Sequence, residues 1–109
     1  MNEILIIGSE SFDRYADVEE FLNANYSKLL FNKPKVYTLS YKGVANCIYH
    51  YFRYHHIPNF KLIQFDNVLK KNILKKIDTL IIINGVPKEN INLVKEAERK
   101  KIKIIDFSL

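Results

Sequence analysis

Small and charged residues follow three of the apolar runs in this 109-residue chain. Gly8, Ser9 and Glu10 follow the first run, Lys42 and Gly43 the second, and Gly85 the fourth. Glycine permits positive φ and a close approach of the backbone to a ligand. The free N–H groups at the start of a helix after Gly43 would attract an anion, and Lys42 would add positive charge. These six residues are therefore predicted to form a ligand-binding site.

Glu10 conflicts with a simple phosphate loop, because it places a negative charge inside the first turn. Acidic residues do bind ribose hydroxyls in dinucleotide-binding folds, so Glu10 could accept hydrogen bonds from a ribose or a base. The chain contains neither a GxGxxG nor a GxxxxGK[ST] motif. The pattern predicts a site for a nucleotide-like small molecule without the usual phosphate-binding sequence.

The histidines and the single cysteine give no pattern of catalysis or metal binding. His50, His55 and His56 contain no i, i+4 pair and no HExxH motif, so no metal site is predicted. Cys47 falls on the expected core face of a helix, where thiols are usually inert. No cofactor and no catalytic residue are predicted, and a protein that binds without catalysis is favoured over an enzyme.

An aromatic stripe in the segment 44–56 predicts a partner surface. Tyr49, Phe52 and His56 lie beside the face that would pack on a sheet, and the segment holds more aromatic side chains than one buried face needs. Aromatic side chains outside a core often mark interfaces. A homo-oligomer or a protein partner is expected through this helix, and a broad core face is the alternative.

The elements that would position these residues alternate along the chain. Four segments of helical period, about 17–30, 44–56, 67–76 and 87–101, separate five short apolar runs. Asp17 with Glu20 predicts the cap of the first helix, with Asp13 as the alternative. This order predicts an α/β fold, a single doubly wound Rossmann-like domain over residues 1–109 with a five-stranded parallel sheet and four helices. The apolar runs are Ile4–Ile7, Val36–Leu39, Leu62–Phe65, Leu80–Ile83 and Ile102–Ile105.

Charge and hydropathy narrow the range of partners. The net charge is +5, but aromatic platforms or an ordered basic stripe would also be needed for nucleic acid, so that partner stays open and unsupported. No apolar run approaches the ~20 residues that span a bilayer, so no membrane partner is predicted. The first residues lack the basic region of a signal peptide, and a cytoplasmic protein is expected.

Three stretches together resemble small SLOG-superfamily proteins of the YspA-like branch. They are IIGSESFDRYADVEEFLN (6–23), YTLSYKGVANCIYHYFRYHHIP (37–58) and KKIDTLIIINGVPKENINLVKEAERKKIKIIDF (75–107). The resemblance implies a Rossmann-like fold and a site for a nucleotide or a related phosphorylated ligand. The matching positions are Gly8, Ser9, Phe12, Asp13, Lys42, Gly43 and Asp78.

The chain departs from the pattern of this family where the family contacts phosphate. Glu10 stands where the family tends to have Arg, Ser40 and Tyr41 replace paired small residues, and Ala45 replaces Asp. The expected pocket therefore binds phosphate poorly. An alternative is a hydrolase of nucleotide N-glycosidic bonds, as in the LOG-type members, using a carboxylate at this edge such as Glu10, Asp13, Asp66 or Glu89. A second alternative is an interaction protein that has kept only the scaffold.

Overall fold

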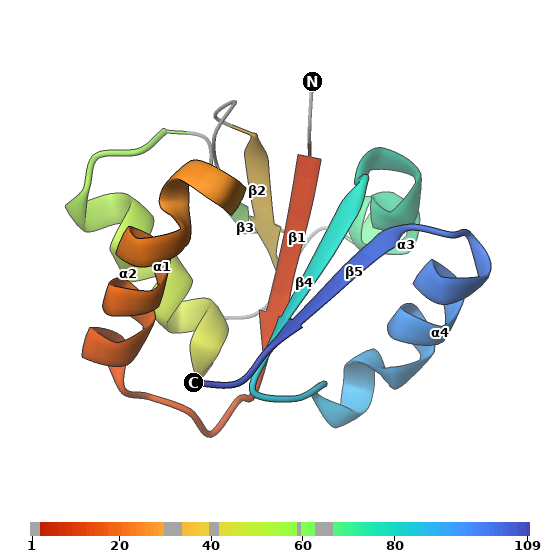
Figure 1. The fold of residues 1–109 in the computed structure, drawn as a ribbon. Coiled ribbons are helices and arrows are strands. Elements are labelled where there is room, and N and C mark those ends of the chain that lie inside the picture. Colours follow the sequence, from red (N-terminus) through yellow and green to blue (C-terminus); the bar gives the residue numbers. More distant parts are fainter. Residues whose placement is uncertain (1–2, 30–33, 40–41, 59, 63–66) are drawn as a thin grey trace.

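A five-stranded parallel sheet forms the centre of the molecule (Figure 1). The computed structural model describes residues 3–29, 34–39, 42–58, 60–62 and 67–109. The strands lie in the order β3-β2-β1-β4-β5, and all four pairings are parallel. This is the predicted α/β, Rossmann-like arrangement. The strands are β1 (Glu3–Gly8), β2 (Lys35–Thr38), β3 (Phe60–Leu62), β4 (Thr79–Ile83) and β5 (Lys103–Phe107).

Helices cover both faces of the sheet. The helices α1 (Tyr15–Leu29) and α2 (Val44–Tyr54) lie on one face (Figure 1). The other face carries α3 (Asn67–Lys76) and α4 (Ile91–Arg99), and a 3₁₀ turn, η1 (Lys88–Asn90), leads into α4. Because one pair of helices covers each face, the central strands are covered on both sides.

Burial on both faces explains why β1 and β4 are continuous apolar runs. Along β1, Ile4 and Ile6 belong to the core beneath α1 and α2, while Leu5 and Ile7 belong to the core beneath α3 and α4. Their exposed fractions are 5% or less. Residues 79–83 of β4 pair with β1 in register over five positions. The two predicted runs, Ile4–Ile7 and Leu80–Ile83, are thus confirmed as the central strands.

The ends of the helices differ from the prediction by a few residues. Helix α1 begins at Tyr15, so Asp17 lies in its first turn, where its carboxylate is 3.2 Å from Arg14 Nε. Helix α2 ends at Tyr54 rather than His56. The His56 N–H donates to Arg53 O, and the Ile57 N–H donates to Phe52 O, with His56 at a φ of 54°. These bonds form a Schellman motif, which ends the helix before Pro58 is reached.

The third strand also shifts along the chain. The sequence predicts residues 62–65, and the structure places β3 at residues 60–62, where it pairs with β2. Residues 63–66, including the candidate carboxylate Asp66, lie outside the described residues, as do Ser40 and Tyr41. Leu62 is the residue that both ranges share, and within the described residues β3 begins two positions before the predicted run.

Candidate functional site

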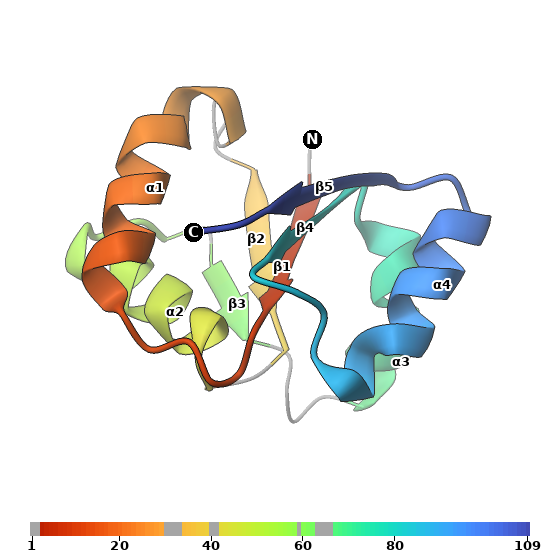
Figure 2. The same cartoon turned by 60° about the horizontal axis from the view of Figure 1, so that its bottom comes forward.

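The predicted site residues lie at the carboxyl edge of the sheet, which comes forward in Figure 2. The adjacent strands β1 and β4 lead to helices on opposite faces, β1 to α1 and β4 by way of η1 to α4. Such a change of direction is the switch point at which open parallel sheets bind ligands. The strand order therefore places Gly8 and Gly85, which follow neighbouring strands, on either side of this point.

Gly8 and Gly43 allow the chain to pack against itself at this edge. A Cβ at Gly8 would overlap the Ile83 carbonyl oxygen and lie 2.9 Å from Val44 Cβ. A Cβ at Gly43 would overlap the Ser9 carbonyl oxygen and lie 2.6 Å from Glu10 Cα. The absence of side chains at both positions is explained by contacts within the chain, before any ligand is considered.

The first turn of α2 is closed in part by the loop after β1. The Val44 N–H donates to Ser9 O at 3.0 Å, which engages an N–H that a bound phosphate would need. The Ser9 side chain is also used locally, since its Oγ lies 3.0 Å from Ser11 Oγ. The predicted phosphate cradle at Ser9, Lys42 and Gly43 is therefore brought together by the fold, but the loop itself occupies much of it.

Gly85 belongs to a separate turn after β4. It has a φ of 94°, and a Cβ there would meet nothing within 4 Å. Its neighbour Asn84 also has a positive φ, 57°, and its side-chain Oδ1 accepts a hydrogen bond from the Leu109 N–H at 2.6 Å. Gly85 is exposed and does not line the pocket at this edge. Its role is conformational, because L-residues with side chains rarely adopt its φ.

A small pocket lies beside the loop after β1. Its volume is about 30 Å³, close to the space that one water molecule occupies in the liquid. Gly8 and Glu10 come from the predicted site. The remainder comes from the end of β1, from the residue after β2, from α2, and from η1 with the turn before it. The other lining residues are Ile6, Ile7, Leu39, Ala45, Pro87, Glu89 and Asn90.

Glu10 and Glu89 bring two carboxyl groups together at this pocket. The pKa of Glu10 is raised, first by a side-chain hydrogen bond with Glu89, then by burial and by the charge of Glu89. Lys42 opposes the rise through its own charge. Glu89 therefore disfavours the ionised form of Glu10, which is the charge that conflicts with a phosphate loop.

Replacing Glu10 with glutamine should raise the free energy of unfolding more at about pH 7 than at about pH 4. Because the raised pKa of Glu10 gives stability that is present at low pH and lost as pH rises through it, the wild type loses this stability by neutrality. The expected difference is a few tenths of a kcal/mol, as for a solvent-screened pair. Urea unfolding at both pH values measures it.

Glu96 provides the control of opposite sign. Arg99 lowers the pKa of Glu96 through a hydrogen bond, so its stability is present above its ordinary pKa and lost as pH falls through the lowered value. Glu96→Gln should therefore lower the free energy of unfolding at about pH 7, and this effect should diminish as the pH is lowered. The same pH trend in both variants would contradict a raised pKa of Glu10.

Comparison with known proteins gives no match. No family model, curated protein or solved structure matches the chain. A function can therefore be inferred only from the geometry of the site, and the SLOG resemblance remains an expectation from the sequence.

Asn90 is the residue that sequence reasoning missed. It is 8% exposed and lies where η1 joins α4, yet its side chain makes no capping hydrogen bond. A polar residue before a helix ordinarily indicates a cap. The segment PKEN before an apolar helical pattern was the available signal, and only the tertiary structure places Asn90 at the pocket beside Glu89.

The cysteine and histidines add no reactive group to the site. Burial first raises the pKa of the Cys47 thiol, with a further contribution from Asp13, and this disfavours the thiolate. His55 Nε2 lies 3.4 Å from Glu19 on α1, away from the carboxyl edge. Among the residues that the structure describes, no group of three His, Cys, Asp or Glu side chains could hold a metal ion.

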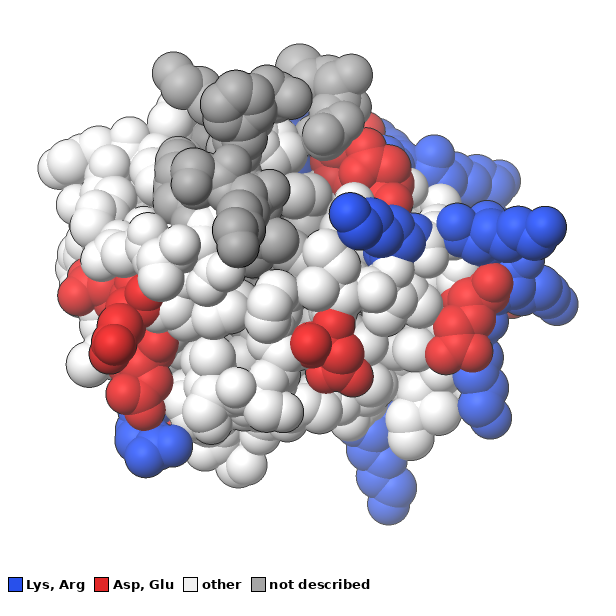
Figure 3. All heavy atoms as spheres, in the orientation of Figure 1, with Lys and Arg blue, Asp and Glu red and all other residues white. Residues whose placement is uncertain are grey.

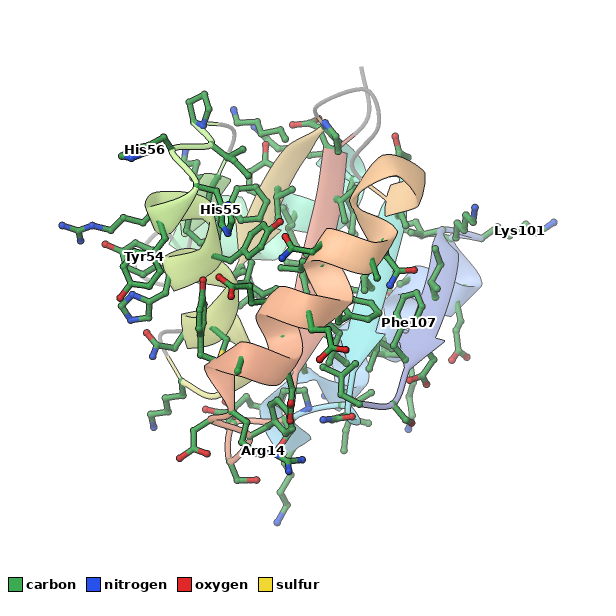
Figure 4. All side chains as sticks on the ribbon, turned by 60° about the vertical axis from the view of Figure 1, so that its left-hand side comes forward. Arg14, Tyr54, His55, His56, Lys101 and Phe107 are labelled. Atoms are coloured by element: carbon green, nitrogen blue, oxygen red, sulfur yellow. The ribbon has the colours of Figure 1, made fainter. Side chains whose placement is uncertain are left out.

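The predicted partner surface on α2 loses one residue. Phe52 is 3% exposed and packs in the core with Phe60, at a ring-centroid distance of 5.5 Å. The prediction of Phe52 as an interface residue is therefore wrong, because the core face of α2 is wider than the helical stripe suggested. Tyr49 is half-buried and His56 is exposed, and Tyr54, 62% exposed, lies beside His56 at the end of the helix (Figure 4).

Charged side chains are distributed unevenly over the surface. Figure 3 shows basic side chains gathered over α4 and the start of β5, and acidic ones over α1. The basic group is Arg99, Lys100, Lys101 and Lys103, at the end of the molecule opposite to the pocket. None of the helices in the described residues is long and apolar enough to cross a membrane.

Proposed function

We propose that the chain is a non-enzymatic binding protein that recognises a nucleotide-like small molecule at the carboxyl edge of its sheet. The pocket beside Glu10 supports this, because it lies where parallel sheets of this strand order bind ligands. The observation that carries the proposal is the position of this pocket at the switch point, with three polar residues, Glu10, Glu89 and Asn90, in its lining.

The size of the pocket limits how the ligand lies. A volume of about 30 Å³ is far below the roughly 300 Å³ at which pockets begin to enclose a whole small molecule. One functional group of the ligand enters, and the rest lies across the edge formed by the loops after β1 and β4. The phosphate is the poorest candidate for the entering group, because Glu10 and Glu89 would repel it.

A thermal-shift screen tests the proposal directly. Nucleosides, nucleotides, cyclic nucleotides and ADP-ribose derivatives are added to the folded protein, and a binder at about 100-fold excess over its Kd should raise Tm by several degrees. Asn90→Leu should remove the shift, whereas Asn92→Leu, at an exposed position in the first turn of α4, should keep it. No shift with any compound would contradict the proposal.

The carboxyl pair favours one second candidate, a hydrolase of nucleotide N-glycosidic bonds. A glutamate whose pKa is raised by a neighbouring carboxyl group, as Glu89 raises that of Glu10, can supply a general acid at a pH where an isolated glutamate is ionised. Release of free base from nucleoside monophosphates, abolished by Glu10→Gln, would establish this activity. Binding without release of base would exclude it.

A further inference from the structure

A broad groove lies beside α1, well apart from the pocket at the carboxyl edge. Its volume is about 380 Å³, within the roughly 300–1,000 Å³ of sites that enclose a small molecule. One stripe of α1, namely Asp17, Glu20, Phe21 and Ala24, forms one wall, and Leu109 forms the other. This groove, called here the α1 groove, shares no lining residue with the pocket beside Glu10.

The apolar walls of the α1 groove are held in place by the fold. The rings of Phe21 and Phe107 meet edge to face with centroids 4.7 Å apart, and both pack against the core beneath α1 and α2. Figure 4 shows Phe107 beside α1, on the side away from α2. The Leu109 N–H donates to Asn84 Oδ1, while the Leu109 residue is 37% exposed. Filling the groove would therefore remove preformed apolar surface from water.

Two carboxylates accompany these apolar walls. Asp17 and Glu20 lie one turn apart on α1, and Glu20 is exposed. Asp17 is 3.2 Å from Arg14 Nε, but the two side chains are 44% and 68% exposed. An ion pair as exposed as this one is worth little, so Asp17 can take another cation as its partner. The α1 groove is therefore suited to an apolar side chain that has cations beside it.

The exposed apolar side chains of the same chain include one of this kind. In the part of the chain that the structure describes, the large hydrophobic residues that are exposed are Tyr54, Ile91 and Leu109. The Tyr54 ring already contacts the rings of His50 and Tyr15, and Leu109 lines the groove itself. Ile91, 44% exposed, is the remaining candidate.

Lysines flank Ile91 on both sides. Ile91 is the first residue of α4, Lys88 precedes it by three positions and Lys95 follows it by four. Residues at these spacings share one face of a helix, and both lysines are exposed. Glu98 is the acid that lies one turn beyond Lys95. The residues Lys88, Ile91 and Lys95, called here the Ile91 patch, thus offer an apolar side chain between two cations.

We propose that the α1 groove binds a second copy of this chain, whose Ile91 patch enters it. The partner's Ile91 occupies the apolar space between Phe21 and Leu109, and the flanking lysines face the two carboxylates of the groove. Lysine carries its charge on a flexible four-carbon stem, so both ammonium groups can reach carboxylates that lie one turn apart. Every copy has both surfaces, so the contact needs no other protein. The inference is independent of the proposed function, because it uses a different part of the molecule.

Sedimentation equilibrium over a range of concentrations measures this contact. The wild type should associate reversibly, and salt raised from about 0.1 M to 1 M should weaken the association by screening the exposed charges. Ile91→Ser should weaken it roughly tenfold or more, and circular dichroism should show an unchanged fold, since Ile91 is partly exposed. A wild type that stays monomeric up to about 1 mM, where even weak complexes form, would overturn the inference.

Charge reversal identifies the two surfaces in contact. Asp17→Asn combined with Glu20→Lys gives a basic groove, and Lys88→Glu combined with Lys95→Glu gives an acidic Ile91 patch. Each double variant alone should be monomeric at concentrations where the wild type associates, because like charges then meet. An equimolar mixture of the two should associate again, since the reversed surfaces match. Failure of the mixture to associate would overturn the pairing of these surfaces.

The control reverses two lysines elsewhere. Lys75→Glu combined with Lys76→Glu, at exposed positions at the end of α3, changes the net charge as much as the variant of the Ile91 patch and should associate like the wild type. Association that persists in both surface variants but is lost in Tyr54→Ala would overturn the inference and place the contact on α2. A monomeric wild type whose groove binds a helical peptide of leucine and lysine would also overturn it and assign the groove to a basic helix of another protein.

Discussion

Replacing Gly43 with alanine should lower the free energy of unfolding by about 3 kcal/mol or more. Two separate effects add at this position. The backbone of Gly43 has a φ of 58° and a ψ of −130°, a region that residues with a Cβ rarely adopt. The new methyl group would also overlap the Ser9 carbonyl oxygen and lie 2.6 Å from Glu10 Cα. Relief requires the loop after β1 to move, because the atoms in contact belong to its backbone.

Gly85→Ala is the matched control for this effect. Gly85 also has a positive φ, 94°, but a Cβ there would meet nothing within 4 Å. Its substitution should therefore include only the conformational term, about 1–2 kcal/mol. Urea unfolding of both variants separates strain from overlap. Equal losses would show that the loop relaxes away from Gly43 without cost, and would contradict close packing as the reason for this glycine.

The same substitution tests how the site is held. Ser9 O accepts the Val44 N–H, and Glu10 follows directly in the chain. Movement of this loop in Gly43→Ala should displace Glu10 from Glu89, so the variant should also weaken ligand binding at temperatures where it remains folded. Gly85→Ala should weaken binding less than Gly43→Ala, because Gly85 does not line the pocket.

The layers of the fold could be predicted because each one depends on a pattern of apolar residues within a short segment of the sequence. A strand covered on both faces needs an unbroken apolar run, and Ile4–Ile7 and Leu80–Ile83 are such runs. Helix ends depend on less visible bonds. His56 and Lys101 both adopt positive φ after their helices, a role usually filled by glycine, so no glycine marks the residue at which α2 ends.

The purpose of each glycine could not be predicted from the sequence. The sequence does not distinguish a glycine that makes room for a ligand from one that makes room for another part of the chain. Only the partner atoms distinguish them, and those of Gly8 come from Ile83 and Val44, which are distant in the sequence. The six predicted residues do reach one edge, but the fold separates Gly85 from the pocket and adds Glu89 and Asn90 to it.

Replacing Phe52 with alanine should lower the free energy of unfolding by about 3–5 kcal/mol, as for other fully buried aromatic side chains. Phe52 is 3% exposed and packs in the core beneath α1 and α2, in contact with the ring of Phe60 on β3. Its carbonyl also accepts the Ile57 N–H in the motif that ends α2. The loss is a large fraction of the 5–15 kcal/mol that stabilises a typical domain.

Tyr54→Ala, two residues further along α2, should change stability by about 0.5 kcal/mol, because the ring is 62% exposed. What it loses is the stacking with His50, at 5.6 Å, and the edge contact with Tyr15, at 5.7 Å. Thermal and urea unfolding measure both variants, and sedimentation at high concentration detects any partner copy. A small effect of Phe52→Ala, together with a shift towards monomer, would return Phe52 to an interface. A large effect at unchanged mass would leave Tyr49, Tyr54 and His56 as the part of α2 that a partner can reach.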